Sequence, residues 1–163
     1  MQQAHNAQGN PLTLNAALVG RTYPPTGAYV VGREKVREFA TAIGDANPAY
    51  HDVAAAQALG YSDVVAPPTF AFVIAYAGSS QAAMDPELGL DYSRVVHGEQ
   101  RFSYSRPIVA GDALVATATI EAIRAVAGND ILTTRVDLAT EAGEHVVTTT
   151  TVIVARGTAE ESA

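Results

Sequence analysis

A short polar turn holds the residues best suited to chemistry. Asp45 and His51 lie a few residues apart in it, with Asn47 and Pro48 between them. A carboxylate and an imidazole on one rigid turn can share a single water and exchange protons with a substrate, which is general acid and base catalysis. Structural interpretations stay open, because Asp45 and Asn47 readily bond the backbone of their own turn and His51 could anchor the helix that follows.

The element expected beside this turn is a buried helix over residues 67–84, a long run without a charged side chain. Apolar residues occupy both of its faces, namely Phe70, Val73, Ile74 and Ala77 on one and Phe72, Ala75 and Tyr76 on the other. Such a helix is typical of a protein core. Its first N–H groups follow Pro67 and Pro68, which have none, and could stabilise a negative charge that develops on a bound carbonyl.

The second half of the chain predicts a sheet that could cover this helix. Its hydrophobic period is two, and hairpin signals separate segments at residues 93–107, 112–126, 130–140 and 144–155. Ahead of the buried helix, the pattern predicts a short strand at 28–31, an amphipathic helix at 33–44 and an Ala-rich helix that stops at Gly60. The fold class is therefore α+β, a curved antiparallel sheet wrapped around one long buried helix.

Length and composition indicate one domain. We expect a mobile tail at residues 1–12, a single domain at 13–156 and a frayed acidic tail at 157–163. The net charge of −7 and the pI of about 4.9 argue against a nucleic-acid or anionic-membrane surface. The absence of cysteine excludes disulfides and thiolate chemistry, and the N-terminus lacks a signal-peptide pattern, so a cytoplasmic location is expected.

Three motifs, taken together, resemble a known family. They are Gly44-Asp45-Ala46-Asn47-Pro48-Ala49-Tyr50-His51, Ala66-Pro67-Pro68-Thr69, and His97-Gly98-Glu99-Gln100-Arg101-Phe102. In this order and spacing they are similar to the MaoC-like hydratases and dehydratases, which have the hot dog fold. The resemblance covers residues 19–155 and is closest to the N-terminal type of MaoC-like domain, as in subunits of heterodimeric (3R)-hydroxyacyl-ACP dehydratases. The family places its His five positions after the Asp, where this chain has Tyr50, with His51 one position later.

The resemblance implies a hydro-lyase that dehydrates a (3R)-hydroxyacyl thioester of ACP or CoA, or hydrates the enoyl form. Asp45 and His51 would be the catalytic pair, and the substrate-binding residues would be Asn47, Tyr50, Pro68, Thr69, Phe70 and His97. His97 also has a structural interpretation, as a residue at the end of a strand that bonds the backbone. No cofactor or metal is expected. The chain is expected to form a homodimer, or a heterodimer with a related subunit.

The displaced His51 leaves a second function open. A non-catalytic subunit could bind the acyl chain while a related partner supplies the working Asp and His. A thioesterase on the same fold is a third and weaker interpretation.

Overall fold

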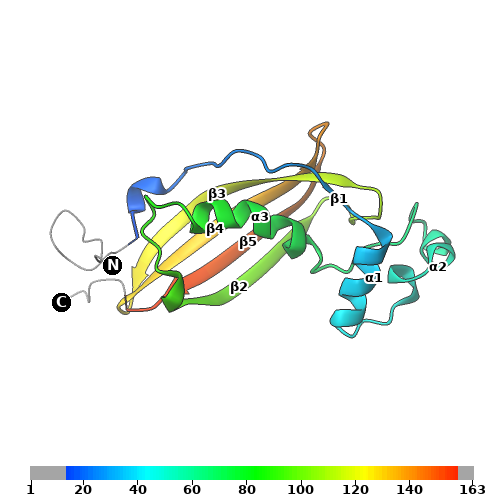
Figure 1. The fold of residues 1–163 in the computed structure, drawn as a ribbon, viewed down its shortest axis with the longest axis horizontal. Coiled ribbons are helices and arrows are strands. Elements are labelled where there is room, and N and C mark those ends of the chain that lie inside the picture. Colours follow the sequence, from blue (N-terminus) through cyan, green and yellow to red (C-terminus); the bar gives the residue numbers. More distant parts are fainter. Residues whose placement is uncertain (1–13, 158–163) are drawn as a thin grey trace.

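The computed structural model describes residues 14–157, and most of both predicted tails lies outside the described residues. Its helices are α1 (Arg33–Ala42), α2 (Val53–Ala58) and α3 (Ala71–Ala83), with short 3-10 turns at Ala16–Leu18, Pro48–Tyr50 and Tyr92–Arg94. Its strands are β1 (Tyr29–Val30), β2 (Val95–Tyr104), β3 (Ala113–Val126), β4 (Asn129–Thr140) and β5 (His145–Ala155). In Figure 1, α3 lies along the sheet, while α1 and α2 stand beyond one end of it.

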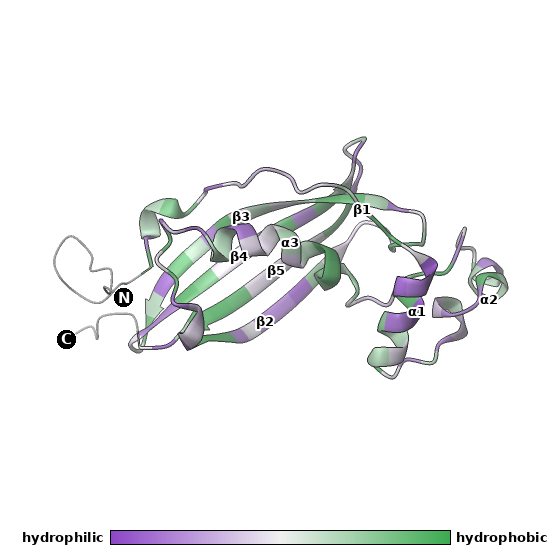
Figure 2. Ribbon diagram, in the orientation of Figure 1, coloured by the Kyte–Doolittle hydropathy of each residue, from purple (hydrophilic) through white to green (hydrophobic). Residues whose placement is uncertain are grey.

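The five strands form one antiparallel sheet in the order β1-β3-β4-β5-β2. Alternate residues of β3 and β4 are buried against α3, including Leu114, Ala116, Ala118, Val136 and Leu138. The remaining positions of these strands face away from the helix, which gives the period of two that the sequence shows. Figure 2 shows long hydrophobic stretches on β3 to β5, and hydrophilic residues on α1 and part of β2. The predicted hot dog architecture is confirmed.

The two edges of the sheet differ. The β1 edge pairs only two residues with β3, and an isolated bridge joins Thr22 to Thr119 further along the same strand. The β2 edge runs for ten residues and is bonded on one side to β5. A bulge between His97 and Glu99 interrupts its register. The long open edge of the sheet is therefore β2.

Helix α3 lies close against the sheet at Gly78. A Cβ atom there would lie 3.2 Å from both the Ala116 Cβ and the Val136 Cγ1. On its other side the helix is less covered than its sequence predicts, since Tyr76 is 51% exposed. Tyr76 is exposed because the single sheet covers only one side of α3. The predicted start at Pro67 is also early: α3 begins at Ala71, because the chain first makes a turn in which the Phe70 N–H donates to the Pro67 carbonyl at 2.9 Å.

An ionic clamp ties the N-terminal segment to the end of α3. One oxygen of the Asp85 carboxylate accepts from the Tyr23 hydroxyl at 2.7 Å and from the Arg21 guanidinium at 2.8 Å. The hydroxyl of Tyr23, the backbone N–H of Glu87 and Arg21 together lower the pKa of Asp85. Within residues 14–157, no helix is long and apolar enough to span a membrane.

The close approach at Gly78 predicts that a larger side chain is not tolerated there. Gly78→Val places a branched side chain against Ala116 and Val136, and overpacking of this kind costs about 1 to 3 kcal/mol of unfolding free energy. Urea denaturation measures the loss. Ala77→Val, at the neighbouring exposed position, is the control and should cost only its helix propensity, below about 1 kcal/mol. Equal losses in the two variants would contradict the packing argument.

The clamp predicts an acid-dependent loss of stability. Because the folded-state pKa of Asp85 lies below its ordinary value of 3.8, the carboxylate's contribution is complete above that pH and disappears as the pH falls through the folded-state value. The difference in unfolding free energy between wild type and Asp85→Asn should therefore shrink in acid. Denaturant titrations from neutral pH to below 3.8 measure it. If the difference in unfolding free energy stays constant over that range, folding is not coupled to protonation of Asp85.

Candidate functional site

The turn after α1 is built by its own polar side chains. Helix α1 ends as predicted near Gly44, whose φ of +74° suits a residue without a Cβ. The Asp45 N–H then donates to the Ala40 carbonyl at 2.9 Å. One carboxylate oxygen of Asp45 accepts from the Asn47 N–H, and the Asn47 side chain accepts from the Ala49 N–H, both at 3.1 Å. Both side chains thus shape the turn in which they stand.

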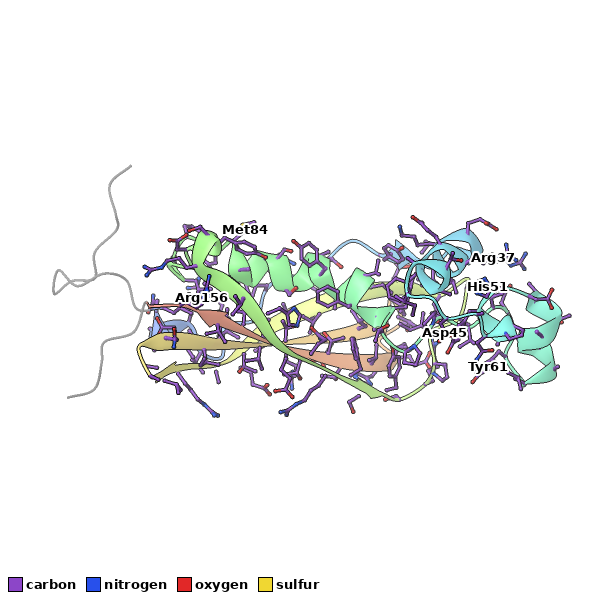
Figure 3. All side chains as sticks on the ribbon, turned by 90° about the horizontal axis from the view of Figure 1, so that it is seen from below. Arg37, Asp45, His51, Tyr61, Met84 and Arg156 are labelled. Atoms are coloured by element: carbon purple, nitrogen blue, oxygen red, sulfur yellow. The ribbon has the colours of Figure 1, made fainter. Side chains whose placement is uncertain are left out.

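His51 closes the same turn. Its Nε2 lies 3.1 Å from the main-chain carbonyl oxygen of Asp45. A carbonyl oxygen can only accept, so Nε2 carries the proton and donates it. The carbonyl of His51 in turn accepts from the Arg37 Nε at 2.8 Å, which ties the turn to α1. Figure 3 shows Arg37, Asp45 and His51 together at the helical end of the molecule, with Met84 and Arg156 at the other end.

A cavity of about 210 Å³ opens between this turn and the start of α3. Its lining is mostly apolar and includes three tyrosines. The lining residues are Asn47, Ala49, Tyr50, Leu59, Tyr61, Val65, Ala66, Pro68, Tyr104, Pro107 and Ile108. The cavity brings together three of the residues expected to bind substrate, Asn47, Tyr50 and Pro68. Asp45 and His51 are not among the residues that line it.

Tyr50 occupies the sequence position where the family pattern has its His, and its side chain reaches this cavity. Burial raises the pKa of the Tyr50 hydroxyl first, and the nearby negative charge of Asp45 raises it further. A hydrogen bond from Asn47 acts in the opposite direction. The hydroxyl is therefore neutral at physiological pH, where it can donate or accept a hydrogen bond but offers no basic group.

The residues at the start of α3 have different surroundings. Phe70 is fully buried and packs edge-to-face on Phe39, with ring centroids 5.4 Å apart. Thr69 is exposed, and its carbonyl accepts from the Phe72 N–H at 3.1 Å. Neither residue lines the cavity, so only Pro68 of this segment reaches both the cavity and the helix start.

His97 lies in another place. It lines a separate cavity of about 70 Å³ between α3 and the sheet, with Phe72, Tyr76 and Thr151 among its neighbours. Its ring stands 5.8 Å from the ring of Phe72, and its Nε2 donates to the Glu99 carbonyl at 3.1 Å. The structure therefore does not bring His97 together with Asn47, Tyr50 and Pro68.

Sequence reasoning missed several residues of the larger cavity, including Leu59, Tyr61 and Tyr104. Tyr104 was the one with a usable signal, since it shares the parity of Phe102 in its strand, and alternate residues of a strand face the same side. Its hydroxyl donates to the Pro68 carbonyl at 2.5 Å. Burial raises the pKa of Tyr104 to about 12, so this donor keeps its proton at neutral pH.

With this geometry in place, comparisons with known proteins decide the family. The family model described as "FAS1-like, dehydratase domain region" matches residues 17–149. The chain belongs to this dehydratase domain family. The UPF0336 protein of Streptomyces coelicolor is 62% identical over 149 residues, which make up 91% of this chain and 99% of that relative.

Solved structures agree with the dehydratase domain assignment. A MaoC-like dehydratase is 41% identical with a TM-score of 0.80; the match covers 86% of this chain and 42% of that one, so this chain spans less than half of its length. A C-terminally truncated HadBC (3R)-hydroxyacyl-ACP dehydratase complex from Mycobacterium tuberculosis is 33% identical with a TM-score of 0.75, over 84% of this chain and 96% of that one. The resemblance to MaoC-like proteins is therefore confirmed.

The apolar lining of the larger cavity predicts that it accepts an apolar ligand. Leu59→Glu places a charge at an exposed position of the lining, and losing the contact of one leucine, about 1.5 kcal/mol, corresponds to about tenfold weaker binding. Titration with a saturated acyl-pantetheine thioester, followed by calorimetry, measures the affinity. Ala58→Glu adds the same charge at an exposed position that does not line the cavity, and it should leave the affinity unchanged. A similar loss in both variants would place the ligand elsewhere.

Proposed function

We propose that this chain is the acyl-chain-binding subunit of a (3R)-hydroxyacyl thioester dehydratase or hydratase, and that a related subunit supplies the catalytic Asp and His. One observation carries the proposal: one carboxylate oxygen of Asp45 and the Nε2 of His51 bond the backbone of their own turn, and neither residue lines the cavity. The place of the family's His is taken by Tyr50, a neutral phenol.

The chemistry of dehydration explains why this observation matters. A proton must leave the alpha carbon of the thioester while the 3-hydroxyl is protonated and departs as water. A base for that step must lie within hydrogen-bond reach of the substrate, directly or through one water. The Nε2 of His51 donates a hydrogen bond to the Asp45 carbonyl, so only its Nδ1 could accept a proton, and His51 does not line the cavity in which the substrate would lie.

The cavity supports the binding role. Leu59, Val65 and Ile108 give it apolar walls suited to a hydrocarbon chain. Asn47 and the tyrosines add a few polar groups, which is the usual composition of a site that orients a mostly apolar ligand. An acyl chain fits these surroundings without any proton transfer by this chain.

An assembly with a related subunit also has support. The HadBC relative is a complex by its name. In this chain the long open edge of the sheet is β2, Val96 on it is 40% exposed, and Tyr92 in the turn before β2 is 50% exposed. An open strand edge pairs readily with another strand, so the partner's sheet would continue this one through β2.

The test is hydration of a crotonyl thioester, followed by the loss of its enoyl absorbance. We expect no turnover by the purified chain alone and turnover when it is co-purified with a MaoC-like subunit that has the family's Asp and His spacing. His51→Ala in this chain should leave the activity of the complex unchanged, because its imidazole serves the turn. Circular dichroism verifies that the variant is folded.

The opposite results favour the other functions. Turnover by the chain alone that His51→Ala abolishes would make Asp45 and His51 the catalytic pair and overturn the proposal. Release of free thiol without any change in the enoyl group would indicate a thioesterase instead. The matched control is the complex in which the catalytic Asp and His of the partner subunit are replaced by alanines. It measures how much of the activity the partner contributes.

A further inference from the structure

The cavity of about 70 Å³ that His97 lines, between α3 and the sheet, is separate from the one assigned to the acyl chain; we call it the α3–sheet cavity. The two cavities share no lining residue. Tyr76 and Tyr92, which line the α3–sheet cavity, are 51% and 50% exposed, whereas Leu132 and Thr134 in its lining are 1% and 5% exposed. The cavity therefore runs from an exposed entrance to a buried end.

The buried end carries a hydroxyl group that the protein itself does not use. Within residues 14–157, no hydrogen bond joins the Oγ1 of Thr134 to another protein group. Two more polar atoms on this face of the sheet, the Gln100 Nε2 and the Thr149 Oγ1, are buried without a partner among the described residues. They share the face with Thr151, which is paired with Gln100 and lies two residues after Thr149. Buried polar atoms without partners are rare in native proteins and call for a ligand or another explanation.

We propose that the α3–sheet cavity binds a small uncharged alcohol, whose hydroxyl bonds Thr134 while its alkyl part lies against Phe72, Leu132 and Ile153. The inference goes beyond the proposed function, because this cavity is separate from the acyl cavity and is complete within one chain. No Asp, Glu, Lys or Arg side chain lines it in the described part of the chain. A charged ligand would lose its hydration there without gaining an ion pair, which is unfavourable.

The free hydrogen-bonding capacity of the cavity favours a hydroxyl over other polar groups. Thr134 can both donate and accept a hydrogen bond. The hydroxyl of Thr151 donates to the Gln100 Oε1 at 2.8 Å, so its oxygen can still accept. His97 donates from Nε2 to the Glu99 carbonyl, which leaves its Nδ1 as an acceptor. A ketone or an ether has no proton to offer these acceptors, and a hydrocarbon would leave the Thr134 hydroxyl unpaired.

The size of the cavity limits the ligand to a short chain. One water needs roughly 10 to 15 Å³ of cavity volume, so about 70 Å³ admits several non-hydrogen atoms. An alcohol that replaces water in such a site keeps a hydrogen bond with its hydroxyl and gains apolar contact with its carbon atoms. Butan-1-ol is therefore a suitable probe.

The first experiment is an NMR titration of the full chain with butan-1-ol. We expect saturable shifts of the main-chain amide signals of Thr134 and Thr151. Thr134→Val replaces only the hydroxyl by a methyl group, so it should weaken binding about three- to tenfold, as for the loss of one hydrogen bond. Thr133→Val makes the same change at the next residue of β4, which points to the opposite face of the sheet, and should leave the affinity unchanged.

A second experiment needs no variant. Methyl propyl ether is an isomer of butan-1-ol that can accept a hydrogen bond but cannot donate one. It should bind wild type about three- to tenfold more weakly than the alcohol, because the acceptors of Thr134, Thr151 and His97 gain no proton from it. The urea midpoint of ligand-free Thr134→Val should not fall below that of wild type, because the replaced hydroxyl has no partner in the protein.

Three results would each overturn the inference. They are non-saturable shifts in wild type, which indicate only adventitious contact with the alcohol, equal affinities of wild type and Thr134→Val, and equal affinities of the alcohol and the ether. A lower urea midpoint of Thr134→Val would also contradict it, because the hydroxyl would then serve the fold. None of these measurements depends on acyl binding or turnover, so they are independent of the proposed function.

Discussion

The packing of α3 onto β3 and β4 determines where everything else in the molecule lies. The helix can rest this close to the sheet because Gly78 has no side chain where Ala116 and Val136 meet it. That contact directs the first residues of α3 toward the helical end of the molecule, where the turn at 45–51 and the end of β2 also arrive. The larger cavity is the space left between these three segments. It exists because α3 is held against the sheet, while the segment that precedes α3 first forms α1 and α2 beyond the end of the sheet and then leads back to it.

Two groups that could serve catalysis in this fold are engaged internally in this chain. The imidazole of His51 donates to a main-chain carbonyl, and the hydroxyl of Tyr104 donates to the Pro68 carbonyl just before α3. Each contact is ordinary when taken alone. Together they describe a site whose shape suits an acyl chain and whose polar groups are already used by the protein, which is the physical basis of the binding role proposed above.

The sequence was sufficient for the architecture, because the hydrophobic periods of two and 3.6 are strong over long segments. The C-terminal end of α1 and the β3–β4 and β4–β5 hairpins followed from glycines with positive φ, which few other residues adopt. The hairpin expected at Gly111 is absent, because β2 pairs with β5 and not with β3. The site was harder to predict. Whether His51 faces the cavity or its own turn depends on a side-chain rotation that no spacing rule specifies. The bond between Tyr104 and Pro68 joins residues that are far apart in the chain, and the parity of the strand shows only that Tyr104 and Phe102 share a side. The exposure of Tyr76 was missed because a single chain was expected to cover its own helix on most sides.

The unequal edges of the sheet limit how large an assembly can become. The β1 edge offers two residues of pairing, and the β2 edge offers ten. If association uses β2 on both chains, each partner consumes the other's only long edge, and growth stops at two subunits. A sheet with two long edges would instead permit end-to-end addition and fibre formation. Because β1 is too short to pair with another sheet, association through β2 cannot continue into a polymer.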